Sequence, residues 1–529
     1  MANWYVRPNT SHNATRDGTS YATAWGGWTE IAWTSIAGGD TLYVCDSHTY
    51  GMILTIGVHG GVASGIRVTI RGDYAGHPGV ITFSAGAYYI DANRNYTTIT
   101  ALTINAGNNA CISPGGAPLI GLTVSNCTFS SGSAPEATIK FRAFSTWAYQ
   151  DCIISGNSFS GGSGSTGGSA IQWYNTSAGV VSTITNLQIY GNTFTNCSSQ
   201  RAVILLKALN TVGAGTKLSD IKIYDNEFTD CSAVAVEAYG PETYGVHSGI
   251  RIYGNTITNQ SQVGVLGGAF ALGGFEKSTT PGFGTNDIYN NKCYGLHGLT
   301  GFCNPMYGTY RIFNNYAENI TTTDIDGCGV LFDHECKDSV AFCNEFRDIH
   351  GKGAADNFDS GFGILVLDAT NCTAYGNLVV NCRTGVAFGN KAAGQSSNIY
   401  NNTFVGCATS GAYLVGGADN TTNDVRNNIF TTTNNALPAV KVNSVAWTGE
   451  SSNCFYGFGA SPSHTMSPST VTSDPQLDTA YRPQATAIKR KGLYLGGKDV
   501  YGKHFYDPPN IGAVDDHPTP AWLTAVEPV

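Results

Sequence analysis

The chain has 529 residues, of which 12% are charged and 66 are glycine, and its net charge is −9. An acidic chain lacks the basic surface that nucleic acids and anionic membranes require, so neither is an expected partner. No apolar run is long enough to span a bilayer, so membrane insertion is not expected either. The apolar share of 42% excludes a disordered chain and is typical of many short strands separated by turns.

The first forty residues are predicted to form a cap. The stretch DGTSYATAWGGWTEIAWTSI places Trp25, Trp28, Ala32 and Ile36 on one face of a short amphipathic helix. Such a helix would cover the open end of a stack of strands. No basic segment followed by an apolar one opens the sequence, so we expect no signal peptide. We assign 1–40 to this N-terminal cap.

One eleven-residue pattern then recurs along the chain, for example as LQIYGNTFTNC, IKIYDNEFTDC and IRIYGNTITNQ. Isoleucine commonly stands three residues before a recurrent asparagine, and phenylalanine commonly stands two residues after it. The asparagines are Asn157, Asn192, Asn226, Asn255, Asn291, Asn315, Asn344, Asn377, Asn402, Asn428 and Asn453. A repeat this short cannot bury a core alone and must stack on its neighbours, which predicts a solenoid.

The residue types in the repeat favour an all-β solenoid of parallel strands, because the strands are β-branched and aromatic. The asparagines would stack at one corner and hydrogen-bond to each other and to the backbone of neighbouring coils. There are 15 cysteines, without a CxxC pair or zinc spacing. Several of them, such as Cys197 and Cys231, fall at apolar positions of the repeat. We therefore predict buried free thiols, folding in a reducing cytosol, and no metal or cofactor.

Both ends of the chain show a family resemblance. The segments WYVRPNTSHNATRDGTSYATAW, IAGGDTLYV, VTIRGD and ALTI resemble the opening of right-handed parallel β-helix proteins of the pectate-lyase-like superfamily. KDVYGKHFYDPPNIGAVDD resembles their ending, in which an IGA strand follows the last coil. The resemblance covers nearly the whole chain. It implies a right-handed parallel β-helix over 41–456 and a small C-terminal extension over 457–529.

Within that superfamily the chain is most similar to bacteriophage tailspike or depolymerase proteins. The resemblance implies a homotrimer that is made in the host cytoplasm, joins other virion proteins in a phage tail, and binds a bacterial surface glycan. This scaffold also carries hydrolases, lyases and proteins without catalysis. A non-catalytic receptor-binding or virion decoration protein, and a cellular polysaccharide lyase, therefore stay open as alternatives.

Insertions between Asn157 and Asn377 are the expected place for a binding groove, because loops on one side of a rigid scaffold commonly carry function. They are rich in aromatic residues, whose faces stack on sugar rings. The predicted substrate-binding residues are Tyr239, Tyr244, Phe275, His334 and Tyr307. The alternative is that these aromatic rings only pack the loops onto the coils.

Four acids are the predicted catalytic residues: Glu237, Asp333, Glu335 and Asp368. They lie near the end of the second strand of nearby coils, where parallel stacking would bring some of them together. Glycoside hydrolysis uses two carboxyl groups, one of them kept protonated. Solvated acids at strand ends, or a cation site, are the alternatives. A lyase would need a base and an arginine or metal that neutralises a uronate. We could match no lyase motif residue by residue, so hydrolase ranks above lyase.

Overall fold

Short strands separated by tight corners make up nearly all of the regular structure in a computed structural model of the chain. The structure describes residues 1–8, 15–57, 66–84, 86, 88–106, 110–114, 118–131, 137–141, 146–161, 168–175, 179–208, 216–239, 249–261, 268–273, 286–298, 301–322, 327–351, 360–367, 369–389, 396–415, 423–442, 447, 449–461, 463–492, 495, 499, 503–505 and 509–514. The strands pair in parallel from coil to coil, and the chain is a right-handed parallel β-helix, as predicted.

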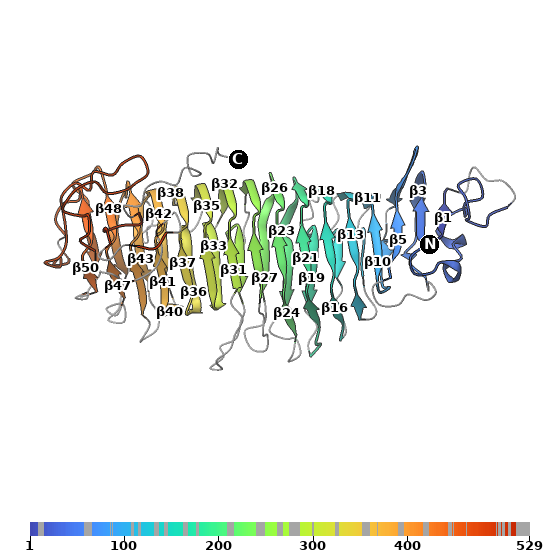
Figure 1. Cartoon of the computed structure of the whole chain (residues 1–529), viewed down its shortest axis with the longest axis horizontal. Coiled ribbons are helices and arrows are strands. Elements are labelled where there is room, and N and C mark those ends of the chain that lie inside the picture. The colour runs from blue at the N-terminus through green and yellow to red at the C-terminus, as the bar shows by residue number, and fades with distance from the viewer. Residues whose placement is uncertain are drawn as a thin grey trace. The chain divides into compact units, whose positions relative to one another are not determined.

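Two compact units divide the chain. The first unit comprises Met1–Leu299 with Met306–Gly308, and the second comprises Thr300–Pro305 with Thr309–Val529. Strand β33 (Gly301–Gly308) has residues in both. Three parallel sheets recur in each unit, and we call them the first, second and third sheets in the order in which a coil visits them (Figure 1).

The first unit contributes long ladders of paired strands to all three sheets. Its first sheet holds β1 (Asn3–Val6), β2 (Thr41–Val44), β5 (Val68–Arg71), β10 (Thr97–Thr100), β13 (Thr123–Ser125), β17 (Ile153–Ser155), β21 (Gln188–Tyr190), β25 (Lys222–Tyr224), β28 (Arg251–Tyr253) and β31 (Asn286–Tyr289). Its second sheet holds β3 (Ser47–Tyr50), β8 (Val80–Phe83), β11 (Thr103–Ala106), β14 (Thr128–Ser131), β18 (Ser158–Gly161), β22 (Thr193–Thr195), β26 (Glu227–Thr229), β29 (Thr256–Ser261) and β32 (Lys292–Gly298). Its third sheet holds β15 (Ile139–Phe141), β19 (Ile171–Asn175), β23 (Ser198–Ala208), β27 (Ser232–Tyr239) and β30 (Phe270–Gly273).

Smaller sheets complete the first unit. One contains β12 (Leu119–Ile120), β16 (Ala148–Gln150), β20 (Thr183–Thr185) and β24 (Lys217–Ser219), and another contains β4 (Leu54–Thr55) and β9 (Ile90–Asp91). The pair β6 (Asp73–Tyr74) and β7 (His77–Pro78) is antiparallel.

The second unit repeats the same plan. Its first sheet holds β34 (Tyr310–Phe313), β37 (Val340–Phe342), β41 (Cys372–Tyr375), β44 (Ser397–Tyr400), β47 (Asp424–Arg426) and β50 (Glu450–Ser451). Its second sheet holds β35 (Tyr316–Thr322), β38 (Glu345–His350), β42 (Leu378–Cys382), β45 (Thr403–Val405), β48 (Ile429–Thr431) and β51 (Cys454–Tyr456). Its third sheet holds β36 (Cys328–Lys337), β39 (Phe362–Val366), β43 (Thr384–Gly389), β46 (Ser410–Val415) and β49 (Val440–Val442), while β40 (Ala369–Thr370) pairs with β36.

The recurrent asparagines form the predicted ladder. Nδ2 of Asn192 donates a hydrogen bond to Oδ1 of Asn226 at 2.9 Å, and Nδ2 of Asn226 donates one to Oδ1 of Asn255 at 3.0 Å. Each also donates to a backbone carbonyl, as Asn226 does to Ile189 at 3.0 Å. The residue before each ladder asparagine turns the corner in the left-handed region, with φ 52° at Asp225. Glycine, aspartate and asparagine tolerate that conformation best, which explains why the repeat reads YGN, YDN or YNN.

The phenylalanines that stand two residues after the corner position of the repeat form part of the core. The rings of Phe129, Phe159, Phe194 and Phe228 stack at centroid distances of 4.9, 4.8 and 4.7 Å. Burying each ring contributes roughly 1.5–3 kcal/mol. All 15 cysteines are free and buried, which confirms the predicted thiols.

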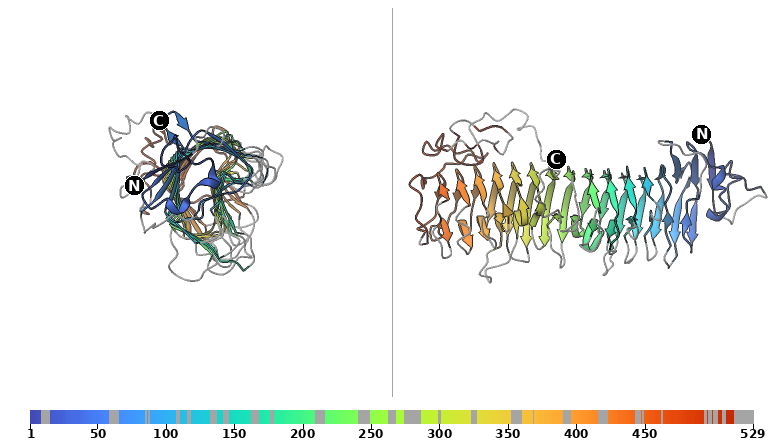
Figure 2. Two further views of the ribbon diagram at one scale, coloured as in Figure 1. Left: turned by 90° about the vertical axis from the view of Figure 1, so that its right-hand side faces the viewer. Right: turned by 90° about the horizontal axis from the view of Figure 1, so that it is seen from below.

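The predicted N-terminal helix is wrong. Two three-residue 3₁₀ turns, Trp28–Glu30 and Trp33–Ser35, take its place, and the described part of 1–40 contains no α-helix. Gly27 has φ 134° and Ile31 is extended, so neither continues a helix. Trp25 instead bridges β1 in parallel, and its amide donates to the Tyr5 carbonyl at 2.9 Å. The Trp25 bridge therefore covers the edge of β1, and the two 3₁₀ turns lie at the same end of the first unit (Figure 2, left).

The IGA segment is also not a strand. Residues 511–513 form a bend, because their three amides donate to three separate segments and not to one neighbouring strand: Ile511 donates to the Ile488 carbonyl within the extension, and the other two donate to the coils. The Gly512 amide donates to the Asn427 carbonyl at 2.7 Å, and the Ala513 amide donates to Oγ1 of Thr403 at 2.8 Å. Ile488 and Ile511 pack on Ile429. The extension is thus fastened along the second unit.

Candidate lysine site on the third sheet

A cluster of charged side chains lies on the third sheet of the first unit, on the face opposite the core. Leu206 on β23 and Ala238 on β27 are fully buried in the core. Successive side chains of a strand alternate between faces, so Lys207, Glu237 and Tyr239 project from the other face. Lys207 and Tyr239 are partners in the register of the two strands.

One buried carboxylate receives two cations here. Glu237 is 3% exposed, and its Oε1 lies 2.9 Å from Nζ of Lys207. Arg201 donates through Nη2 to Oε1 at 3.1 Å and through Nε to Oε2 at 3.3 Å. A charge this deeply buried is costly unless it is paired, and this one is paired twice. We call Arg201, Lys207, Glu237 and Tyr239 the lysine site.

A β-bulge brings Arg201 into the cluster. The register runs from Ser198 opposite Ser232 to Ala202 opposite Val234, so β23 advances four residues while β27 advances two. The extra residues bend the strand locally and redirect a side chain, as bulges commonly do next to functional sites. The Arg201 side chain remains 34% exposed.

Arg201 also keeps hydrogen-bonding capacity for a ligand. Nε and Nη2 of Arg201 donate to Glu237, whereas Nη1 of Arg201 donates to no acceptor within the described ranges. A guanidinium group binds a carboxylate through two parallel hydrogen bonds in a fixed geometry. The partly exposed edge of Arg201 therefore suits an anionic ligand.

The environment of Lys207 favours the neutral amine more than water does. Burial lowers the pKa of Lys207 from its ordinary 10.5, and the Glu237 carboxylate offsets this effect only in part. A buried lysine with a lowered pKa is the form in which lysine serves as a general base. Lys207 is therefore the candidate base of the site.

Tyr239 fixes the position of the ammonium group. Nζ of Lys207 lies 4.5 Å from the centroid of the Tyr239 ring, a cation–π contact. The Tyr239 ring also lies against Gly273 of the next strand, β30. A Cβ atom on residue 273 would lie 2.5 Å from Cε2 of Tyr239. Glycine at 273 thus leaves room for the ring. The Tyr239 ring thus lies beside Lys207 and Gly273, and its predicted role as a sugar platform stays a prediction.

The predicted catalytic acids have separate surroundings. Glu237 lies in the lysine site of the first unit, and Asp333, which is 6% exposed, lies on β36 of the second. Glu335 also belongs to β36, but its side chain is outside the description, and Asp368 is outside the described residues altogether. Two of the four side chains are not described and the other two belong to different units, so the carboxylate pair stays a prediction.

The side chains of the other predicted substrate-binding residues lie outside the described part of the chain. Tyr244 and Phe275 lie outside the described residues. Tyr307 on β33 and His334 on β36 are in strands whose backbone is described, but their side chains are not. A sugar-binding role for these four stays a prediction.

The sequence reasoning missed Arg201 and Lys207. One signal was available in the segment AVILLKA, where Lys207 is a single charge in an otherwise apolar run. A lone charge in such a run is expected to have a partner on a neighbouring strand. The partner could not be identified, because Glu237 stands 30 residues further along the chain.

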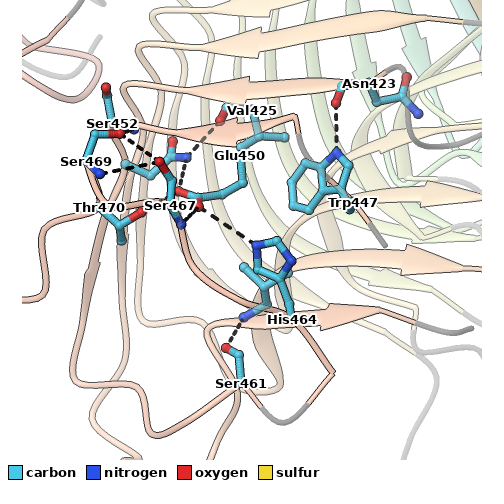
Figure 3. A network of polar contacts seen from close by, with 12 residues as sticks. Asn423, Val425, Trp447, Glu450, Ser452, Ser461, His464, Ser467, Ser469 and Thr470 are labelled. Atoms are coloured by element: carbon cyan, nitrogen blue, oxygen red, sulfur yellow. Dashed lines mark hydrogen bonds and ion pairs between the residues drawn. The ribbon is translucent and has the colours of Figure 1, made fainter. Parts of the chain in front are cut away.

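A second buried glutamate, in the second unit, has no lysine or arginine among its partners within the described ranges (Figure 3). Glu450 is 3% exposed and accepts hydrogen bonds from Asn453 Nδ2 at 2.9 Å, the Ser467 amide at 2.9 Å and Thr470 Oγ1 at 2.8 Å. His464 Nε2 lies further away, at 3.9 Å. Burial raises the pKa of Glu450, but His464 first, and then Asn453, the Ser467 amide and Thr470, outweigh burial and lower the pKa from its ordinary 4.5. Glu450 thus fastens the C-terminal extension to the last coil.

The described part of the chain lacks two features. No group of three or more His, Cys, Asp or Glu side chains there is placed to hold a metal ion. No helix there is long and apolar enough to cross a membrane.

Fold and site together define a right-handed parallel β-helix protein that carries a buried lysine–glutamate–arginine cluster. No protein-family profile matches the sequence, and no curated protein matches it. Among solved structures, a PL6 alginate lyase in complex with a trisaccharide is 12% identical with a TM-score of 0.43, over 98% of this chain and 96% of that one. The A-module of a mannuronan C-5 epimerase from Azotobacter vinelandii is 11% identical with a TM-score of 0.33, over 68% and 90%. Similarities of this size do not bear on the activity.

Proposed function

We propose that the chain cleaves an anionic polysaccharide by β-elimination at the lysine site. The observation that carries the proposal is the Lys207 ammonium group, held between the Glu237 carboxylate and the Tyr239 ring and less basic than lysine in water. Beside it, Arg201 offers free donors to a substrate carboxylate. A base and a neutralising cation are the two parts that a polysaccharide lyase needs.

The reaction assigns one role to each cation. Arg201 binds the carboxylate of a uronic acid unit and withdraws charge from it, which makes the proton on the adjacent carbon more acidic. Lys207, as the neutral amine, takes that proton. The electrons form a carbon–carbon double bond, the glycosidic C–O bond breaks, and the leaving oxygen takes a proton from water. Glu237 touches both cations and sets their positions.

Hydrolysis through Glu237 is less well supported. A general acid must be protonated at working pH, and a carboxyl group achieves this through a like charge or an apolar pocket. Glu237 instead has the Lys207 amine and the Arg201 guanidinium within 3.3 Å, and the described residues of the first unit place no second carboxyl group of the predicted set beside it. We therefore place elimination ahead of hydrolysis, reversing the order that the sequence favoured.

Two product measurements on one set of polysaccharides test the proposal. Alginate and polygalacturonate would be compared with a neutral glucan, following both reducing ends and the ultraviolet absorbance of an unsaturated product. We expect both signals to rise on a polyuronate only. Reducing ends without absorbance would indicate a hydrolase, and binding without either signal would indicate a non-catalytic protein.

The phage assignment rests on the sequence resemblance alone. We keep it as a proposal that the chain is a homotrimeric tail protein that binds a bacterial surface glycan. Light scattering of the purified chain at the monomer mass of 55.7 kDa would contradict the trimer.

A further inference from the structure

The outer face of the second sheet in the first unit carries a regular array of hydroxyl groups. On β22, Thr193 and Thr195 flank the buried Phe194 and point away from the core. Consecutive paired strands from β14 to β29 repeat this arrangement, reading TFS, SFS, TFT, EFT and TIT. Nine of these ten outward positions are serine or threonine, and Glu227 is the exception. We call these positions the hydroxyl face.

The five threonines on the last three strands of this face, β22, β26 and β29, are available to a ligand. Within the described ranges, the side chains of Thr193, Thr195, Thr229, Thr256 and Thr258 make no hydrogen bond to the protein. All five residues are partly exposed. Their hydrogen-bonding capacity is therefore directed at solvent.

Other hydroxyls of the same unit are bonded to the protein, and on the hydroxyl face itself Ser130 Oγ donates to Asn105 Oδ1 at 2.6 Å and Ser160 Oγ donates to the Phe129 carbonyl at 3.4 Å. On the first sheet, Ser125 Oγ donates to Thr100 Oγ1 at 3.1 Å. On the small sheet, the Thr185 and Ser219 hydroxyls are 3.1 Å apart. Hydroxyl groups in adjacent coils are thus able to hydrogen-bond to each other. The five threonines on β22, β26 and β29 make no such bond within the described ranges.

The array has two fixed repeats. Strand pairing sets about 4.8 Å between neighbouring coils, and two residues along a strand set about 6.7 Å across them. Threonine is also stiff at χ1, so its hydroxyl and methyl groups keep their positions at little further entropic cost. The face is a rigid two-dimensional net of hydroxyl and methyl groups.

We infer that the hydroxyl face binds ice. Only a partner with a two-dimensional lattice engages the whole net at once, and many weak contacts then add through multivalency. The lattice of ice oxygens has repeats close to those of the net, carries no charge, and both donates and accepts hydrogen bonds. A glycan chain fits less well, because β14 to β29 present no outward aromatic ring for a sugar and no cation for a uronate.

Partition into slowly grown ice tests the inference on the full chain. The wild type should enter the ice, whereas a globular protein without such a net stays in the liquid. Thr195→Lys, at the centre of the net, should lower uptake to the level of that excluded protein. Thr98→Lys, which makes the same change at an outward position of the first sheet, should leave uptake unchanged. Glu227→Thr repairs the one interruption and should raise uptake above wild type.

Equal circular dichroism and melting temperature in all variants would show that uptake reports the surface and not unfolding. Wild type left in the liquid, or equal uptake by Thr195→Lys and wild type, would overturn the inference. Binding to microcrystalline cellulose without ice uptake would overturn it too and assign the face to a neutral polysaccharide. Polysaccharide cleavage should be unchanged in Thr195→Lys, so this outcome is separate from that of the lysine site.

Discussion

Two lysines of this protein lie over tyrosine rings in the same way, yet within the described ranges only one of them also pairs with a buried carboxylate. Nζ of Lys207 is 4.5 Å from the centroid of Tyr239, and Nζ of Lys441 is 4.4 Å from that of Tyr413. Each pair joins adjacent coils of the third sheet. Lys207 and Tyr239 belong to the first unit, and Lys441 and Tyr413 belong to the second. The repeat therefore builds the same lysine–tyrosine contact twice.

The difference lies in what surrounds the ammonium group. Lys207 is 7% exposed and paired with Glu237, whose second cation is Arg201. Lys441 is partly exposed and has no ion pair within the described ranges. The lysine–tyrosine contact alone is thus a packing device, and the buried carboxylate with its arginine makes it a candidate site.

The largest expected effect separates the two lysines by activity. Lys207→Met keeps the volume but removes the base, so we expect cleavage of a polyuronate to fall by roughly 10²–10⁴-fold, the usual contribution of a general base. Lys441→Met is the matched control and should retain wild-type rates. Initial rates of ultraviolet absorbance measure both. Equal rates in the two variants would remove Lys207 from the mechanism.

The next effect concerns stability at the carboxylate. Glu237→Gln leaves Lys207 and Arg201 without their counter-charge, and removing one partner of a buried ion pair costs about 3–5 kcal/mol. We expect a loss of this order in urea unfolding near pH 7. A loss below about 1 kcal/mol would mean that water already reaches this carboxylate, as it does in exposed pairs.

The repeat makes the fold readable from the sequence, but it does not reveal the site. Asn192, Asn226 and Asn255 recur with fixed flanking residues because every coil needs the same corner, so their stacking could be predicted. Arg201 and Lys207 occur once. Their meeting with Glu237 depends on the pairing of β23 with β27 and on a bulge, and neither leaves a repeating signal.

The cap shows a different limit of sequence reasoning. Trp25, Trp28 and Ile36 have helical spacing, and all three are buried as an amphipathic helix would bury them. Their burial comes instead from a strand bridge and two 3₁₀ turns, since Gly27 breaks the helix. Apolar spacing over so short a segment identified three of the four residues predicted to be buried, whereas Ala32 is exposed, and it did not identify the backbone conformation.

A buried carboxylate without lysine or arginine sharpens the comparison. Glu450→Gln should leave cleavage unchanged but cost about 1.5–3 kcal/mol near pH 7, because hydrogen bonds to a charged acceptor weaken. The pKa of Glu450 is lowered in the folded chain. Its contribution is therefore complete above the ordinary carboxyl pKa and is lost as the pH falls through the folded value. The gap between wild type and variant should close on acidification, and a gap that is constant with pH would contradict this account.

The pH dependence of cleavage tests the lowered pKa of Lys207. Because the active form of the base is the neutral amine, the rate should rise about tenfold per pH unit below the pKa, equivalent to about 1.4 kcal/mol per unit. The rise should level off below pH 10.5, since burial lowers the pKa of Lys207. A rate that falls from neutral pH upward would favour a protonated catalytic group instead.

The smallest expected effect is the stability of Lys441→Met. A cation–π contact at a partly exposed position contributes about 0.5–1 kcal/mol, and methionine retains most of the apolar contact with Tyr413. No buried counter-charge loses its partner in this variant, unlike Glu237 in Lys207→Met. We therefore expect the urea midpoint of Lys441→Met to stay close to that of wild type, and that of Lys207→Met to fall clearly further. Equal shifts of the urea midpoint would mean that the contact with the tyrosine ring contributes more to stability than the ion pair with Glu237. The surroundings of Lys207 and Lys441 would then not differ in their effect on stability.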